Sequence, residues 1–151
     1  MSKIKTVGIV GTGVIGTGWI IRNLAHNKIV HAYDQNKNLK NYVLKEIKRT
    51  SKSIKKLFGK KILIKNLKFF NSLEKALSNV DFVQESVLEN YKVKTDLIQK
   101  ISKYVKSNVI ISSSSSGLLP SKIFSKSKNP QRGIIGPVSY THLTLPTSTH
   151  G

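Results

Sequence analysis

Three glycines near the N-terminus have the spacing that phosphate binding requires. Gly11, Gly13 and Gly16 form a G-x-G-x-x-G motif, with Val14 and Ile15 before the last glycine. In such a motif the first glycine permits a tight turn, the second lets a pyrophosphate approach the backbone, and the third lets a helix pack against the sheet. Backbone N–H groups at the start of that helix bind the phosphates, so the motif predicts a dinucleotide site at these five residues.

One acidic residue stands where the ribose of a dinucleotide is expected. Asp34 follows Gly16 by 18 residues and comes at the end of the second expected strand. A carboxylate at this place accepts hydrogen bonds from the ribose hydroxyls and repels a 2′-phosphate, which favours NAD over NADP as the cofactor. The alternatives are a glycine-rich turn without a ligand and a solvated aspartate in a turn.

Short apolar runs alternate along the chain with longer stretches of helical spacing. These are the elements that must position the residues described above. We expect strands at 4–10, 29–33, 67–70, 81–86, 109–111 and 132–136, and helices at 14–25, 39–58, from 72 onward, 91–105 and 121–126. This alternation predicts an α/β fold, a doubly wound parallel sheet with helices on both faces. The five serines at 112–116 are either a flexible linker or a tight turn between strand and helix, and their position directly after a strand favours the turn.

The composition limits the class of protein. The 151 residues carry a net charge of +19 and no cysteine, which suits one domain and excludes a disulfide scaffold and a thiolate metal site. No apolar run is long enough to cross a membrane, so we expect a cytoplasmic protein without a metal or a membrane partner. Only Arg22, Arg49 and Arg132 among the 26 basic residues are arginines. Compositional drift toward lysine therefore explains the charge better than nucleic-acid binding, which stays open as an alternative.

Two later segments resemble the 3-hydroxyacyl-CoA dehydrogenase family. They are VQESVLEN at 83–90, followed by KVK at 92–94, and SSSSGLLPS at 113–121. Their form is most similar to the branch that contains L-carnitine dehydrogenase and λ-crystallin, and the resemblance covers about residues 4–136. It implies oxidation of a secondary 3-hydroxy group with hydride passed to NAD, a small-molecule substrate (a 3-hydroxy acid or an acyl-CoA), and a homodimer formed through a further helical domain.

The resemblance also implies roles for single residues. Ser116 matches the serine that binds the substrate oxygen, and Glu89 matches a glutamate at the edge of the cofactor site. We therefore assign Ser116 and Glu89 to catalysis. Lys94 matches a lysine near the nicotinamide-side ribose, and Ser86 and Ser114 are assigned to the cofactor site as well.

The resemblance stops at position 137. The family's catalytic histidine is expected 21 residues after Ser116, where this chain has Pro137. The next ten residues, VSYTHLTLPT, resemble the translation of a transposase sequencing adapter. We therefore expect residues 1–137 to form an NAD-binding domain and 138–151 to be a non-native tail. The chain as given is expected to bind NAD without turning over substrate; a stand-alone NAD-binding module is the alternative.

Overall fold

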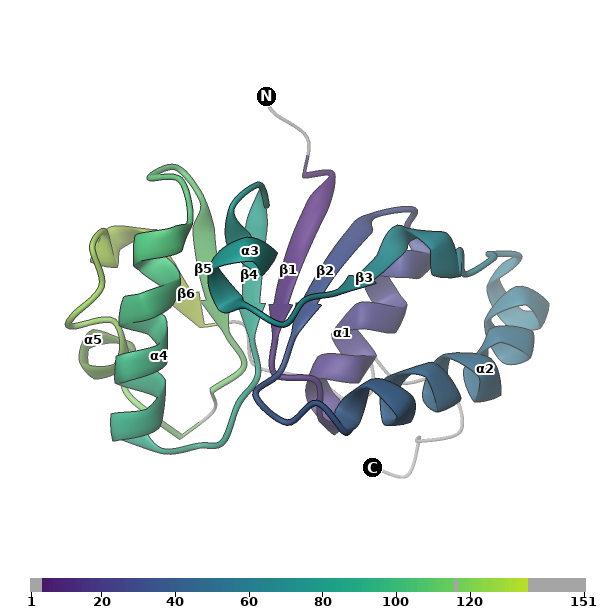
Figure 1. The fold of residues 1–151 in the computed structure, drawn as a ribbon, viewed down its shortest axis with the longest axis horizontal. Helices are drawn as coiled ribbons and strands as arrows, with labels where there is room; N and C mark the ends of the chain where they lie inside the picture. The colour runs from purple at the N-terminus through teal and green to yellow at the C-terminus, as the bar shows by residue number, and fades with distance from the viewer. Residues whose placement is uncertain (1–3, 116, 136–151) are drawn as a thin grey trace.

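A computed structural model describes residues 4–115 and 117–135 of the chain. These residues form one six-stranded sheet whose strands are all parallel, in the order β3-β2-β1-β4-β5-β6 (Figure 1). The strands are β1 (Thr6–Val10), β2 (Ile29–Tyr33), β3 (Leu67–Phe69), β4 (Phe82–Glu85), β5 (Ile110–Ser113) and β6 (Gly133–Ile135). The helices are α1 (Val14–Ala25), α2 (Leu39–Phe58), α3 (Leu73–Leu77), α4 (Tyr91–Tyr104) and α5 (Pro120–Ile123). Two short 3₁₀ turns, Ile64–Asn66 and Pro130–Arg132, complete the elements described.

This architecture confirms the predicted fold class, and the strand order is the one in which two mononucleotide-binding halves meet between β1 and β4. Several element boundaries differ from the prediction by one to three residues, and the difference at β5 concerns the site. β5 extends through Ser112 and Ser113, which pair with Gln84 and Glu85 of β4. The serine run is thus partly strand, because two of its members complete the backbone hydrogen bonds of a central strand.

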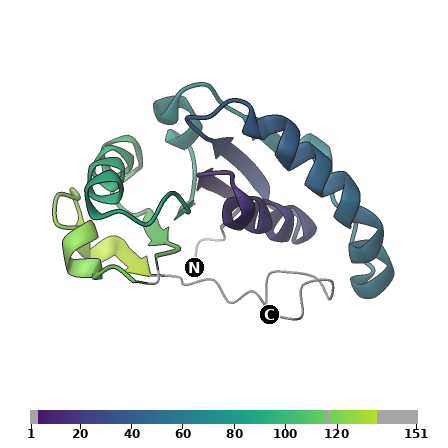
Figure 2. The ribbon, with the colours of Figure 1, turned by 90° about the horizontal axis from the view of Figure 1, so that it is seen from below.

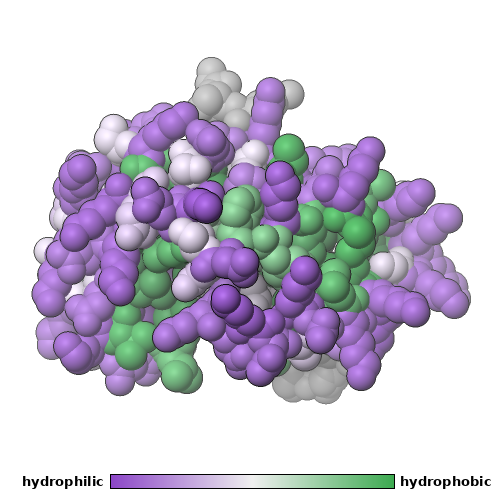
Figure 3. Space-filling view, in the orientation of Figure 1, coloured by the Kyte–Doolittle hydropathy of each residue, from purple (hydrophilic) through white to green (hydrophobic). Residues whose placement is uncertain are grey.

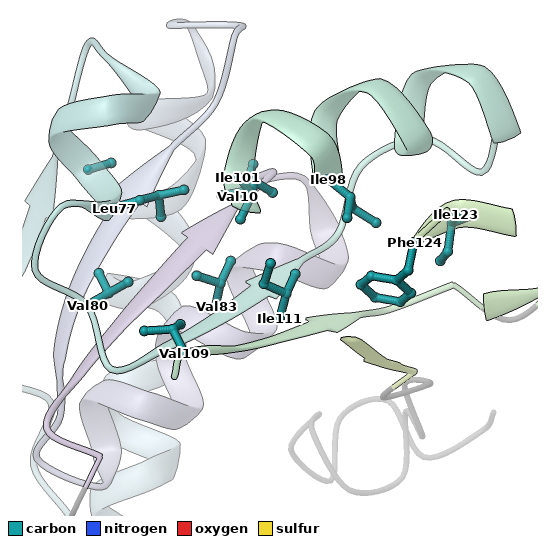
Figure 4. Close-up of a cluster of buried hydrophobic side chains, with 11 residues drawn as sticks. Val10, Leu77, Val80, Val83, Ile98, Ile101, Val109, Ile111, Ile123 and Phe124 are labelled. Carbon is teal, nitrogen blue, oxygen red and sulfur yellow. The ribbon is translucent and has the colours of Figure 1, made fainter. Parts of the chain in front are cut away.

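The sheet is covered on both faces because its central strands are apolar on both sides. Val7 and Ile9 of β1 pack in a cluster with α1 and α2, whereas Val10 belongs to a second cluster with α3, α4 and α5. Figure 4 shows the second cluster, in which Val83 and Ile111 of neighbouring strands lie beneath α4. The turned view in Figure 2 shows α1 and α2 on one side of the sheet and α4 on the other. Burial on both faces is the pattern expected for strands of a parallel sheet.

Local capping fixes where the helices near the carboxyl edge of the sheet begin. The Asn90 side chain accepts a hydrogen bond from the Val93 N–H at 3.0 Å and starts α4. Ser72 caps α3 in the same way through the Lys75 N–H. The cap at Asn90 sets the register of α4, so that Lys94 falls on the same helix face as the buried residues Ile98 and Ile101.

Two further features concern the molecule as a whole. Hydrophilic side chains cover most of the face seen in Figure 3, with hydrophobic ones gathered in smaller areas right of its middle and toward its lower left. Among the described residues, no helix combines the length and apolar character needed to span a membrane.

Candidate dinucleotide-binding site

The glycine loop after β1 has a backbone that only glycine accommodates at two places. Gly11 adopts φ +94°, and a Cβ there would lie 2.8 Å from the backbone carbonyl of Ser86. A Cβ on Gly16 would lie 1.7 Å from the carbonyl oxygen of Gly11. These close approaches let α1 begin directly against the ends of β1 and β4, which is the turn that the motif predicts.

At position 13, glycine is favoured for a different reason than at positions 11 and 16. A Cβ at this position would meet no atom within 4 Å, because Gly13 faces an open groove at the N-terminus of α1. No side chain caps this helix N-terminus, and no acidic residue lies in its first turn. The backbone N–H groups there remain available to an anion, and a groove that a Cβ would narrow fits the pyrophosphate of a dinucleotide.

Asp34 lies directly after β2 and links that strand to the glycine loop. Its carboxylate accepts hydrogen bonds from the Thr12 N–H and the Asn36 N–H, each at 2.7 Å. The Gly11 N–H in turn donates to the Tyr33 carbonyl at 2.9 Å. These bonds hold the acidic side chain beside the loop, on the side where the sequence predicts the adenosine ribose.

Two adjoining cavities follow the carboxyl edge of the sheet. The larger has a volume of about 920 Å³ and includes Asp34 with Leu39, Leu73 and Leu97 in its walls. The smaller has a volume of about 470 Å³ and is lined by Val14, Ile15, Glu89, Lys94 and Ser114, among others. Both are lined by Gly13, Ser86, Val87 and Leu88. The glycine loop therefore lies between two halves of one cleft, as binding of a dinucleotide across the switch point requires.

A buried ion pair lies beneath the smaller cavity. The Lys94 ammonium is 2.8 Å from a carboxylate oxygen of Glu85, and the two side chains are 1% and 0% exposed. Glu85 also accepts hydrogen bonds from the Ser113 hydroxyl and from the Val87 N–H. The many donors around this carboxylate compensate for its removal from water, so the group joins β4, β5 and α4.

Glu89 connects the loop before α4 to the serine run. Its carboxylate accepts hydrogen bonds from the Ser115 hydroxyl at 2.8 Å and from the Gly117 N–H at 3.0 Å. The Lys94 ammonium is 3.7 Å from the same carboxylate. These contacts hold the serine run against the smaller cavity.

Ser86 and Ser114 meet at the junction of the two cavities. Their hydroxyl oxygens are 2.7 Å apart, and the Gln84 side-chain amide donates to Ser114 at 2.7 Å. The chain continues the β4–β5 pairing here, because the Ser114 N–H donates to the Glu85 carbonyl at 2.8 Å. Two hydroxyls from separate strands thus lie side by side at the edge of the cleft.

The structure brings most of the predicted site residues to one cleft. Gly11, Gly13, Val14, Ile15, Gly16, Asp34, Ser86, Glu89, Lys94 and Ser114 all line it or form its loop. The predicted substrate-binding residue Ser116 lies outside the described residues. Among the described residues, no group of three or more histidine, cysteine, aspartate or glutamate side chains is arranged to hold a metal ion.

Sequence reasoning missed Glu85, Gln84 and Ser115. A signal for Glu85 was present, because Lys94 stands four residues before Ile98 and seven before Ile101, on the apolar face of a helix. A lysine at such a core position requires a buried carboxylate partner. Glu85, at the end of an otherwise apolar strand, was the candidate.

A sequence model of the NAD binding domain of 3-hydroxyacyl-CoA dehydrogenase matches residues 6–148. L-carnitine dehydrogenase from Pseudomonas putida is 37% identical over 137 residues, which are 90% of this chain and 43% of the relative. L-carnitine dehydrogenase from Oceanobacillus iheyensis is 36% identical over 133 residues, 87% of this chain and 43% of the relative. The structure of 3-hydroxybutyryl-CoA dehydrogenase from Escherichia coli superimposes with a TM-score of 0.78 at 21% identity, covering 87% of this chain and 29% of that one.

The fold and the glycine loop define a Rossmann-type domain that binds NAD. The sequence match makes the assignment more specific. The chain belongs to the 3-hydroxyacyl-CoA dehydrogenase family and comprises its NAD-binding domain. It spans less than half the length of the curated relatives that it matches.

Proposed function

We propose that this domain serves an oxidoreductase that oxidises the secondary hydroxyl of a 3-hydroxy acid and passes the hydride to NAD. The observation that carries the proposal is the contact between Glu89 and the serine run. It places hydroxyl groups at the edge of the smaller cavity, beside the groove in which the dinucleotide binds. A substrate oxygen bound by these hydroxyls would lie beside the half of the cleft in which the reacting end of the cofactor is expected.

The roles of the chain's own residues follow from this arrangement. The N–H groups after Gly13 hold the pyrophosphate, and Asp34 holds the adenosine ribose. When bound, NAD supplies the hydride acceptor. The serine run, with Ser116 as the residue assigned to the substrate oxygen, orients the hydroxyl group. Glu89 fixes that run, and Lys94 supports Glu89 from below.

A small 3-hydroxy acid is the preferred substrate class. Relatives that share 32–37% identity with this chain are named L-carnitine dehydrogenase, and carnitine is a 3-hydroxy acid. An acyl-CoA is the second candidate, since the matching family is named for 3-hydroxyacyl-CoA substrates.

A domain exchange tests this function. Residues 1–136 replace the corresponding domain of the P. putida L-carnitine dehydrogenase, and NADH formation is followed by absorbance. We expect reduction of NAD with L-carnitine, or with a 3-hydroxyacyl-CoA if the second candidate holds. The same exchange with Gly13→Ala is the matched control and should lose activity. A folded exchange protein that binds NAD and oxidises neither substrate contradicts the proposal.

We further propose that residues 1–137 form the NAD-binding domain and that 138–151 are not native. The absence of a histidine at position 137 and the adapter-like string after it support this boundary. The chain as given should then bind NAD but show no turnover. Sequencing the source locus past the codon for Gly136 tests the boundary, because a histidine codon at the next position supports it and an unchanged Pro-Val-Ser-Tyr reading contradicts it.

A homodimer and a cytoplasmic location remain predictions from the resemblance and the composition. Size-exclusion chromatography of the full-length protein checks the first. The alternative of a nucleic-acid-binding protein gains no support from the family, whose named relatives are dehydrogenases.

A further inference from the structure

Acidic residues gather at the cofactor cleft of an otherwise basic protein. The chain has 26 basic and seven acidic residues. Four of those seven, Asp34, Glu74, Glu85 and Glu89, line the cleft or lie beneath it. The lining also includes Lys94 and Lys100, so the cleft is richer in acidic groups than the chain as a whole.

Two carboxylates and one ammonium lie at or beneath the smaller cavity. Glu89 and Lys94 are the charged residues in its lining, and Glu85 lies directly beneath Lys94. One ammonium is shared by two carboxylates, at 2.8 Å from Glu85 and 3.7 Å from Glu89. These three side chains together carry a net charge of −1.

The position of Glu89 is fixed by the fold. Hydrogen bonds from Ser115 and Gly117 hold both of its carboxylate oxygens, and its side chain is 41% exposed toward the cleft and solvent. Hydrogen bonds that donate to the ionised form stabilise the negative charge. The cleft therefore presents a preorganised carboxylate in its smaller half.

The two redox forms of the cofactor differ in charge at one end. The oxidised nicotinamide ring is a cation and the reduced ring is neutral. Because Asp34 lines the larger cavity, the adenosine is expected there. The glycine loop between the cavities holds the pyrophosphate, so the nicotinamide belongs in the smaller cavity. We propose that Glu89 selects the oxidised cofactor over the reduced one. The proposal rests on the assignment of this cleft to NAD.

The test is a comparison of affinities for the two forms. The full 151-residue chain is titrated with NADH, whose own fluorescence reports binding, and NAD⁺ is measured by displacing NADH. For Glu89→Gln we expect the preference for NAD⁺ over NADH to fall about three- to tenfold relative to the wild type. The affinity for NADH should change by less than about twofold.

Glu74→Gln is the matched control. It removes the same charge from the other half of the cleft, where Glu74 lines the larger cavity, and should leave the preference unchanged. Glu89→Asp retains the charge and should retain most of the preference. An equal preference in the wild type and Glu89→Gln, or an equal loss in Glu74→Gln, overturns the proposal.

Salt dependence gives a second measurement that needs no variant. Raising the salt from about 0.02 M to about 0.5 M shortens the Debye length and should reduce the wild-type preference for NAD⁺. A preference independent of salt contradicts the charge-based explanation. Failure of the wild-type chain to bind either form would instead overturn the assignment of the cleft to NAD, and the inference with it.

Discussion

The two halves of the cleft are built in different ways. The glycine loop and Asp34, in the wall of the larger half, lie in backbone turns after β1 and β2, and the Asp34 carboxylate accepts hydrogen bonds from the Thr12 and Asn36 N–H groups. The smaller half is formed by side chains that join β4, β5 and α4, with the Glu85–Lys94 pair at its base. The glycine loop and Asp34 thus depend on local conformation, whereas the polar groups of the smaller half depend on contacts between distant parts of the chain.

The difference explains which half a sequence motif can specify. A glycine loop followed by an acidic residue encodes the first half within 24 residues, from Gly11 to Asp34. The second half requires Glu85 and Ser113, which are 28 residues apart, to meet Lys94. Substitutions in the first half should therefore affect mainly cofactor binding, and substitutions in the second half should affect folding as well.

The largest effect is expected from Lys94→Met. Removing the ammonium leaves the Glu85 carboxylate buried without its charge partner, which costs about 3–5 kcal/mol of unfolding free energy. Urea denaturation followed by circular dichroism measures it. The control Lys92→Met removes a lysine that is 87% exposed and 3.6 Å from Asp96, and should cost less than about 1 kcal/mol.

A double variant sharpens this prediction. Adding Glu85→Gln to Lys94→Met removes the uncompensated charge and should restore part of the lost stability. If the two substitutions are simply additive, the pair does not interact as the structure indicates.

The next largest effect is expected in the other half. Asp34→Ala removes a carboxylate that is held beside the ribose site and should weaken NAD binding by about ten- to hundredfold, the equivalent of a lost charge-assisted hydrogen bond. Calorimetric titration with NAD measures it. The discrimination against NADP should decrease in parallel, since the repulsion of a 2′-phosphate is lost. Unchanged affinity for both cofactors would place the ribose elsewhere.

At Gly13, the addition of one methyl group should affect NAD binding but not the stability of the fold. Gly13→Ala introduces a Cβ that meets nothing within 4 Å and so should change the unfolding free energy by less than about 1 kcal/mol. The methyl projects into the groove and should weaken NAD binding by roughly five- to hundredfold. Calorimetry and urea denaturation on the same sample distinguish the two effects. Tight NAD binding by this variant argues against a pyrophosphate at the loop.

Sequence reasoning predicted the fold more completely than the site. The alternation of apolar runs defined all six strands to within a few residues, because the central strands of a parallel sheet are buried on both faces. The glycine loop and Asp34 were also specified locally. The partner of Lys94 was not, since the apolar helix face around Lys94 indicates that a carboxylate is needed but no spacing encodes a contact with the ends of β4 and β5.

The smallest effect is expected at the opposite edge of the sheet. The Asp81 carboxylate accepts hydrogen bonds from the Lys5 and Thr6 N–H groups at 2.9 Å each, and these bonds hold the pKa of Asp81 below its usual range. A lowered pKa in the folded state stabilises the protein above the unfolded value of about 3.9, and this stabilisation is lost as the pH falls through the folded value.

Asp81→Ala should therefore cost about 1 kcal/mol or less at neutral pH. The difference from the wild type should shrink below about pH 4, as urea denaturation across the pH range would reveal. NAD affinity should not change, because Asp81 lies away from the cleft. An equal cost at every pH would assign the effect to packing rather than to the carboxylate.

The most direct test of the account is hydrogen exchange of the 151-residue chain with and without NAD, measured by mass spectrometry. If one dinucleotide spans the cleft, NAD should slow exchange both at the glycine loop with residues 34–36 and at residues 86–94 with the serine run. Protection confined to the glycine loop and residues 34–36 would contradict the claim that the two halves form one cofactor site.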